Sequence, residues 1–258
     1  MDTLNELYQE LLNKVFEDDL HSQQYYLKVV EDQRKISVDY LLSLGALFIP
    51  NNDYIYHYLG TKADSFRAGL YIRGVTPWML CVVFPIRTLS GEIKGLTAWD
   101  AYNKYLEQSE DAVGLSTYRV SPVSIFPKDK FFLTDIKCLR EHFNERVIFI
   151  TDGVFDAISL NYRGIPAIAL LGSTFSREVL YYLRWYRAIY VCTDNDKAGV
   201  VLYQRLKKAV PNVYRVVQGR TKDIEELLRY DGVDGVVTEQ LRSLVKSPVF
   251  VDYTIRGK

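Results

Sequence analysis

The sequence predicts an α/β fold: a mostly parallel sheet with helices on both faces, preceded by a mixed α/β subdomain and followed by a short helical C-terminal segment. From residue 146 onward, short and almost continuously apolar runs alternate with amphipathic stretches, which is typical of a parallel sheet buried on both faces. Before residue 100 the chain is rich in β-branched and aromatic residues broken by glycines. The expected domains are 1–140, 141–230 and 231–258.

The first forty residues predict helices, because apolar residues recur there at helical spacing. These residues are Leu4, Leu7, Leu11, Leu12 and Val15, followed by Tyr25, Tyr26, Val29 and Val30. A short helix is expected to begin at Ser37 and to end at Gly45. Residues 80–99 predict a β-hairpin, since two apolar runs flank a turn at 89–91.

Four apolar runs in the second half predict parallel strands at 146–151, 165–172, 188–193 and 213–217. Each run is followed by a helix-like segment, at 154–164, 176–186, 197–210 and 222–230. Crossovers between parallel strands are right-handed, so these helices are expected to cover the sheet.

The composition indicates an ordinary globular chain. Of 258 residues, 48% are hydrophobic, and 32 basic residues balance 32 acidic ones. We expect no membrane association, because no apolar run approaches the roughly 20 residues that span a bilayer. The isolated Cys81, Cys138 and Cys192 lack metal-ligand spacing. They predict a reducing, intracellular compartment and no zinc in this chain.

Carboxylates follow the ends of three predicted strands. They are Asp152 after the first strand, Asp194 and Asp196 after the third, and Asp223 and Glu225 a short loop after the fourth. Asp156 lies one helical turn beyond Asp152 and can face the same side. Ligands of open parallel sheets bind beyond the carboxyl ends of the strands, so we expect these side chains to converge.

Converging carboxylates repel one another unless cations neutralise them. Oxygen ligands without His or Cys favour Mg²⁺ or Mn²⁺ over zinc, and such ions suit phosphoryl chemistry. The alternative for a single aspartate is a helix N-cap, which is the favoured interpretation for Asp194 taken alone and a natural one for Asp223. Gly172 and Ser173 follow the second strand, where they could present backbone N–H groups to phosphate or form a tight turn.

The segments "ITDGVFDAISL", "LLGSTFS", "CTDNDKAG" and "TKDIEELL" resemble the successive motifs of the Toprim fold, which primases, topoisomerases and some nucleases share. Primases match best. "TDNDKAG" resembles their Asp-Gly-Asp-x-Ala-Gly segment, and "KDIEE" resembles Lys-Asp-Pro-Asp-Glu with Glu225 in place of the second Asp. Upstream, "VVFPIRTLSGEIKGLTAW" and "YRVSPVSIFPKDK" resemble segments of the DnaG-type primase N-terminal subdomain. The resemblance covers residues 40–230, most specifically 146–226.

The resemblance implies the RNA polymerase domain of a DnaG-type primase, located in the cytoplasm of a bacterial cell or a phage-infected host. Such a domain would make short RNA primers from NTPs on single-stranded DNA, using Mg²⁺ or Mn²⁺ in a two-ion site. The implied metal ligands are Asp152, Asp194, Asp196, Asp223 and Glu225. Asp152, Asp156, Asp194 and Asp196 would be catalytic, with Asp152 as a possible general base and Asp156 orienting the loop. Lys128, Lys130, Lys197, Gly172 and Ser173 would contact nucleotide or DNA.

The sequence departs from the family pattern in three places. Asp152 stands where the family has Glu, one methylene longer. The arginines that the family carries around the Phe-Pro-Ile and Gly-Phe segments are replaced at 78–81 and 97–99. We expect no flanking zinc-binding or helicase-binding region, so template recognition and helicase docking are expected to need other chains. Those partners would be a replicative helicase or a separate zinc-binding, template-recognition protein.

Two other functions remain open. The same acidic cluster would serve a Toprim nuclease, although the upstream segments favour a primase. A catalytically degenerate relative would bind nucleic acid or replication proteins, which the Asp152 substitution and the missing arginines motivate. The basic side chains of the C-terminal third are either a face for single-stranded DNA, with aromatic rings for stacking, or ordinary solvated helix surface. They are Arg184, Arg187, Arg205, Lys207 and Lys208.

Overall fold

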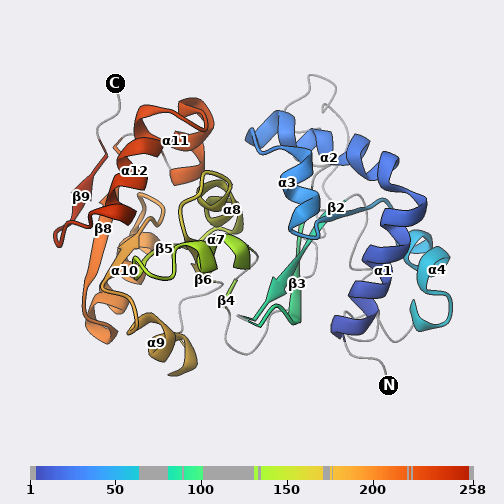
Figure 1. Ribbon diagram of the computed structural model, residues 1–258, viewed down its shortest axis with the longest axis horizontal. Coiled ribbons are helices and arrows are strands. Elements are labelled where there is room, and N and C mark those ends of the chain that lie inside the picture. Colours follow the sequence, from blue (N-terminus) through green and yellow to red (C-terminus); the bar gives the residue numbers. More distant parts are fainter. Residues whose placement is uncertain are drawn as a thin grey trace. The chain divides into compact units, whose positions relative to one another are not determined.

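The computed structural model divides the chain into two compact units, Met1–Phe126 and Pro127–Lys258 (Figure 1). The described residues are 4–63, 81–88, 90–100, 131–132, 135–170, 175, 177–219, 221 and 223–255. The division falls before the boundary expected at residue 140. The three domain ranges from the sequence stay a prediction.

The first unit packs helices on a three-stranded antiparallel sheet of order β1-β2-β3. Its elements are α1 (Leu4–Asp18), α2 (Leu20–Arg34), α3 (Val38–Ser43), β1 (Leu47–Ile49), α4 (Asn52–Leu59), β2 (Cys81–Arg87) and β3 (Ile93–Asp100). Ser37 begins α3 as predicted, because its side chain accepts the Tyr40 N–H. The apolar faces of α1 and α4 form one core with the sheet, which confirms the helical periodicity of the N-terminal residues.

The predicted hairpin is β2–β3, closed by a hydrogen bond from Thr88 N to Glu92 O of 2.9 Å. The outer edge of β1 is satisfied by a side chain instead of another strand. Gln23, fully buried, donates from Nε2 to Phe48 O at 2.9 Å and accepts from Phe48 N at 2.7 Å. The amide of Gln23 therefore takes the place of a neighbouring peptide group.

The second unit is built on a six-stranded sheet of order β4-β6-β5-β7-β8-β9. The four predicted parallel strands are present as β5 (Val147–Thr151), β6 (Ala167–Leu170), β7 (Ala188–Val191) and β8 (Val213–Val217). Two edge strands were not predicted. They are the antiparallel β4 (Phe131–Phe132) and the parallel β9 (Tyr253–Thr254).

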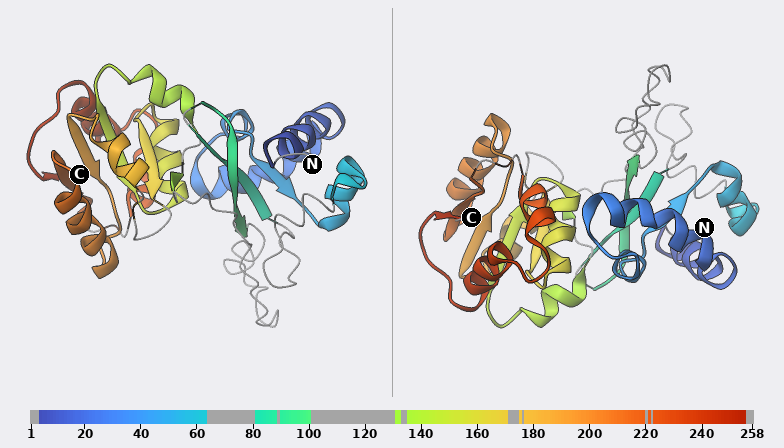
Figure 2. Two further views of the ribbon diagram at one scale, coloured as in Figure 1. Left: turned by 90° about the horizontal axis from the view of Figure 1, so that it is seen from below. Right: turned by 90° about the horizontal axis from the view of Figure 1, so that it is seen from above.

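Helices cover both faces of this sheet, as predicted (Figure 2). They are α7 (Ile136–Glu141), α8 (Val154–Tyr162), α9 (Arg177–Leu183), α10 (Lys197–Ala209), α11 (Ile224–Asp231) and α12 (Val236–Lys246). Apolar residues of α7, α9 and α10 pack with Ile148 and Ile150 of β5 on one face. Helices α8, α11 and α12 contact one another in series on the other face. Among the described segments, no helix combines the length and apolar character needed to cross a bilayer.

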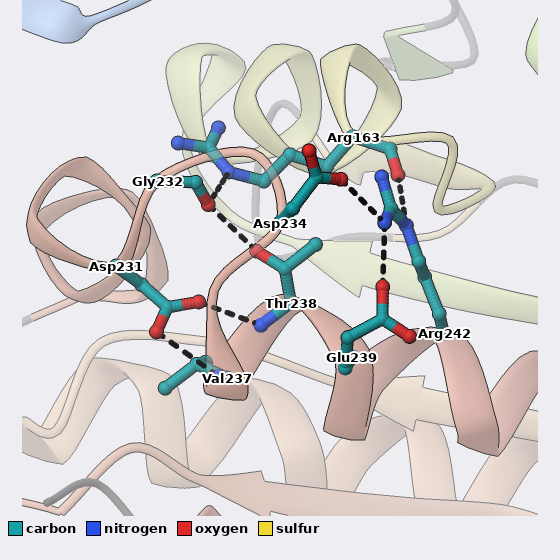
Figure 3. A network of polar contacts seen from close by, with 8 residues as sticks. All are labelled: Arg163, Asp231, Gly232, Asp234, Val237, Thr238, Glu239 and Arg242. Carbon is teal, nitrogen blue, oxygen red and sulfur yellow. Dashed lines mark hydrogen bonds and ion pairs between the residues drawn. The ribbon is translucent and has the colours of Figure 1, made fainter.

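A buried arginine at the end of α8 forms hydrogen bonds with the two C-terminal helical segments (Figure 3). Arg163 is 1% exposed and donates hydrogen bonds to three backbone carbonyls: Ser159 O at 2.9 Å, Leu228 O at 2.7 Å and Gly232 O at 3.4 Å. Its own carbonyl accepts from Arg242 Nε at 2.9 Å. The C-terminal end of α8 is thereby joined to both α11 and α12.

Candidate metal centre

Three of the predicted carboxylates meet at the carboxyl edge of the second unit's sheet. Asp152 follows β5, Asp156 lies in the first turn of α8, and Asp194 follows β7. Because β5 and β7 are adjacent and parallel, their ends lie side by side. One oxygen from each carboxylate lies within 4.8 Å of the other two. We call these three residues the acidic cluster.

Two similar hydrogen bonds, each from a threonine hydroxyl to a glycine carbonyl, shape this edge of the sheet. The Thr151 hydroxyl at the end of β5 donates to Gly153 O at 2.8 Å, and the Thr193 hydroxyl after β7 donates to Gly199 O at 3.0 Å. A side chain at Gly199 would clash with backbone, and one at Gly153 would displace the Asp156 carboxylate. A Cβ at Gly153 would lie 2.0 Å from Asp156 Oδ2, and one at Gly199 would lie 2.2 Å from Asp194 O. The glycines therefore let helix and strand approach closely enough to gather the carboxylates.

Asp156 is the most buried member of the acidic cluster, at 7% exposed. Its Oδ1 accepts the Glu225 N–H at 3.0 Å, which links α8 to the first turn of α11. Burial raises the pKa of Asp156 well above its ordinary value, and repulsion from the Asp223 carboxylate adds to this rise. Without a cation, the site therefore disfavours full ionisation of its carboxylates.

The surroundings of Asp152 fit a bound cation. Within the described part of the chain, its buried Oδ1 has no hydrogen-bond donor. Burial, and next the Asp194 carboxylate, raise the pKa of Asp152. A buried carboxylate oxygen without a donor is costly, and a divalent cation would satisfy it. Three hard oxygen donors at this spacing fit Mg²⁺ or Mn²⁺.

Two other predicted ligands cap helices. Asp196 accepts the Gly199 N–H at 2.8 Å at the start of α10, and Asp223 accepts the Glu226 N–H at 2.7 Å at the start of α11. Asp223 therefore caps a helix, as its alternative interpretation predicted. Asp194 does not cap α10, because Asp196 is the N-cap residue there. Neither cap residue belongs to the acidic cluster.

Glu225 also lies outside the acidic cluster. It is 2% exposed and is paired with Arg229: Arg229 Nε donates to Oε1 at 3.1 Å and Nη2 donates to Oε2. Lys197 is exposed at the first position of α10. The remaining predicted contacts, Lys128, Lys130, Gly172 and Ser173, lie outside the described residues.

Two residues that the sequence did not single out join the loops of the site. Asn195 Nδ2 donates to Thr221 O at 2.8 Å and to Gly219 O at 3.4 Å. Gln218 Nε2 donates to Thr193 O at 3.2 Å. The loop after β7 is thereby tied to the loop that leads to Asp223. The sequence offers one sign of the Asn195 contact: Asn195 stands where the resembled primase segment has Gly.

Known proteins match this architecture. The Toprim-like family model matches residues 149–228. The Gene 57 protein of Mycobacterium phage D29 is 26% identical over 112 residues, which is 43% of this chain and 72% of that protein. Similar solved structures include the RNA polymerase domain of Mycobacterium tuberculosis primase DnaG in complex with a double-stranded DNA oligomer with a 6-nucleotide overhang. It has a TM-score of 0.70 and 17% identity, over 95% of this chain and 79% of that one.

A DnaG primase catalytic domain bound to single-stranded DNA is also similar. Its TM-score is 0.66 at 18% identity, and the match covers 92% of this chain and 78% of that one. The fold predicted from the sequence motifs is therefore confirmed. The chain has the fold of the RNA polymerase domain of a DnaG-type primase, with a Toprim-like domain over residues 149–228.

Proposed function

We propose that this chain synthesises short RNA primers on single-stranded DNA by divalent-metal-dependent nucleotidyl transfer from NTPs. The observation that carries the proposal is the acidic cluster, whose oxygens lie within 4.8 Å of one another at the carboxyl edge of the sheet. The fold supports the proposal, because two of the similar primase domains were solved with DNA.

Asp152 and Asp194 would hold the metal ion directly. They follow adjacent strands, and Asp152 Oδ1 is a buried oxygen without a donor in the described chain. Asp156 would hold α11 in place through Oδ1 and offer Oδ2 to the ion. When bound, Mg²⁺ or Mn²⁺ would lower the pKa of the attacking 3′-hydroxyl and offset charge on the departing pyrophosphate.

Asp196 and Asp223 would complete a second ion position. Each uses one oxygen to cap a helix, which fixes the side chain and leaves the other oxygen for a ligand. Glu225 would act at a distance from the ion, because Arg229 already balances its charge. Lys197 would contact the triphosphate from the start of α10. Nucleotide or DNA contacts by Lys128, Lys130, Gly172 and Ser173 are proposed from the sequence alone.

The test is de novo synthesis of labelled RNA on single-stranded templates with NTPs and Mg²⁺ or Mn²⁺. Asp194→Asn should lower the rate by about 100-fold or more, since it removes a charged ligand. Asp234→Asn is the matched control, because Asp234 is 85% exposed and remote from the acidic cluster in sequence. The proposal is wrong if wild type makes no RNA, or if Asp194→Asn retains full activity while folded.

A parallel reaction with labelled DNA and no NTPs separates the alternatives. Metal-dependent cleavage without synthesis would indicate a Toprim nuclease. Metal-dependent thermal stabilisation with neither activity would indicate a degenerate binding protein. Added replicative helicase or a zinc-binding template-recognition protein would test whether other chains supply those functions.

A further inference from the structure

Cationic and aromatic side chains gather at the edge of the second unit's sheet that lies opposite the acidic cluster. Arg146 and Arg187 directly precede β5 and β7, whereas Asp152 and Asp194 follow the same strands. The two strands are parallel neighbours, so both arginines lie at the starts of adjacent strands. Strands of this length span about 15 Å, which separates the arginines from the carboxylates.

Hydrogen bonds join two distant chain segments at this edge. Arg146 Nε donates to Trp185 O at 2.7 Å, and Arg187 N donates to Arg146 O at 2.7 Å. Arg146 N also donates to Phe143 O at 3.3 Å. With Arg184, the neighbour of Trp185 in sequence, these residues form one surface. We call it the amino-edge surface: Phe143, Arg146, Arg184, Trp185 and Arg187.

The backbone of Arg146 adopts φ +52°, a left-handed conformation that glycine or asparagine adopts more readily than arginine. The turn alone would therefore be more stable with glycine or asparagine at position 146 than with arginine. Arg146 Nε donates to the Trp185 carbonyl, so the turn places a cation against the backbone of an exposed aromatic residue. Unusual backbone geometry of this kind occurs often at functional sites.

The aromatic rings of the amino-edge surface face solvent. Phe143 is 63% exposed and Trp185 is 56% exposed, and the three arginines are exposed as well. Two acids lie nearby in sequence. Glu141 lies 3.9 Å from Lys137, and the partly buried Glu145 lies 3.9 Å from His142, which balances its charge only when protonated. Three exposed arginines therefore outnumber the one carboxylate that lacks a permanent cation beside it. The surface therefore combines exposed rings with an excess of positive charge.

We propose that the amino-edge surface binds single-stranded nucleic acid, with unpaired bases stacked on Phe143 and Trp185 and phosphates paired with the three arginines. Rings beside guanidinium groups recognise this class of ligand, because every base has a stacking face and every linkage carries a negative charge. The inference goes beyond primer synthesis, since binding at this edge needs neither metal nor turnover. Template DNA and product RNA share the required chemistry.

The experiment measures binding of fluorescein-labelled oligo(dT) and oligo(rU) to the full chain by anisotropy, in EDTA without NTPs, across a range of salt concentrations. Trp185→Ala should weaken binding at least about fivefold, the lower end of what one stacked base contributes. Arg187→Ala should weaken binding and lower the slope of log affinity against log salt by about 0.7. Tighter binding of oligo(dT) would assign the surface to template, and tighter binding of oligo(rU) to product.

Matched controls remove similar side chains elsewhere. Tyr230→Ala removes an aromatic ring that is 80% exposed on α11, and Lys28→Ala removes an exposed cation from α2. Both should bind as wild type. Hydrogen bonds of Trp185 use its backbone atoms, so Trp185→Ala should remain folded, and its thermal unfolding checks this.

The proposal is overturned if wild type binds neither oligonucleotide, or if Trp185→Ala and Arg187→Ala both keep wild-type affinity and salt slope. If both variants keep wild-type binding, the amino-edge surface would instead bind a protein partner. Asp194→Asn should bind as wild type in EDTA, although it should not synthesise RNA. Failure of the metal centre and failure of the amino-edge surface are therefore seen in separate measurements.

Discussion

Asp156 Oδ1 accepts the backbone N–H of Glu225 at 3.0 Å, across 69 positions of the chain. The bond places the start of α11 against the acidic cluster, while Arg163 holds the other end of α11 through Leu228 O. Helix α11 is thus attached to α8 at both ends. Asp223, the cap of α11, is fixed relative to Asp152 and Asp194 by these two attachments.

Substitutions of Asp156 separate its two roles. Asp156→Ala leaves the buried Glu225 N–H without its acceptor and should lower the free energy of unfolding by about 1–3 kcal/mol in Mg²⁺. Asp156→Asn keeps an acceptor and removes a charge, so in EDTA it should be at least as stable as wild type. Urea unfolding of both variants, with and without Mg²⁺, checks this. Equal destabilisation of the two variants in EDTA would contradict it.

The pH dependence of stability reports on Asp152. Burial and the Asp194 carboxylate raise its folded-state pKa above the ordinary value of 3.8, so the metal-free folded state holds its proton more tightly than the unfolded chain. Stability contributed by the protonated form is therefore lost as pH rises from the unfolded pKa through the folded pKa.

In EDTA, wild type should accordingly gain stability relative to Asp152→Asn as pH falls from about 7 toward about 4. Bound Mn²⁺ should reduce the difference at neutral pH, because the cation offsets the charge. Thermal unfolding across this pH range measures it. A constant difference between the two proteins would show that Asp152 does not titrate with a raised pKa.

The two hydrogen bonds that Asn195 donates between loops, called here the loop clamp, should strengthen metal binding. Asn195→Ala and Asn195→Gly remove two hydrogen bonds that join the loops of Asp194 and Asp223. Each such bond contributes about 0.5–1.5 kcal/mol, so Mn²⁺ should bind roughly tenfold more weakly. Calorimetric titration with Mn²⁺ measures this, and Asn144→Ala, at an exposed position, is the control. Unchanged affinity would show that the loops hold their positions without the clamp.

Arg163 should be a major contributor to the stability of the second unit. Arg163→Met removes the guanidinium donor from Ser159 O of α8 and Leu228 O of α11, whereas Gly232 O keeps the Thr238 hydroxyl as a donor. Because each buried group that loses its partner costs about 1–3 kcal/mol, we expect a loss of about 2 kcal/mol or more in unfolding free energy. Arg187→Ala, on the exposed edge, should change it by less than about 0.5 kcal/mol. Urea unfolding of the two variants compares them.

Local sequence pattern was enough to predict which acids lie at the edge of the sheet. Apolar runs end at Thr151 and Thr193, so the acids that follow them had to lie at one sheet edge, and Asp152 and Asp194 do. Asp196 and Asp223 were harder to assign, because an aspartate that begins a helix can cap it, bind a cation or do both. Sequence pattern does not separate these roles.

Long-range contacts could not be predicted in the same way. The Asn195 to Thr221 bond spans 26 positions and depends on how two loops approach each other. Strand β9 has two residues and joins the sheet only through its register with β8, so it carries no periodic signal. Nothing in the local sequence distinguishes the buried Arg163 from other charged residues at helix ends. Its role comes from the distant carbonyls of α11.

Lengthening Asp152 by one methylene tests the geometry of the acidic cluster. Oxygens that share one Mg²⁺ lie about 3 Å apart, given metal–oxygen distances of about 2.1 Å, and the cluster brings its oxygens within 4.8 Å of one another. A glutamate at this position keeps the charged oxygens on a longer, more flexible side chain, so Asp152→Glu should keep primer synthesis within about tenfold of wild type. Asp152→Asn keeps the length and loses the charge, and should reduce synthesis by about 100-fold or more. Rates for the two variants on one template, in Mg²⁺ and in Mn²⁺, make the comparison. If Asp152→Glu were as inactive as Asp152→Asn, Asp152 would need its exact length, which fits a general base better than a metal ligand.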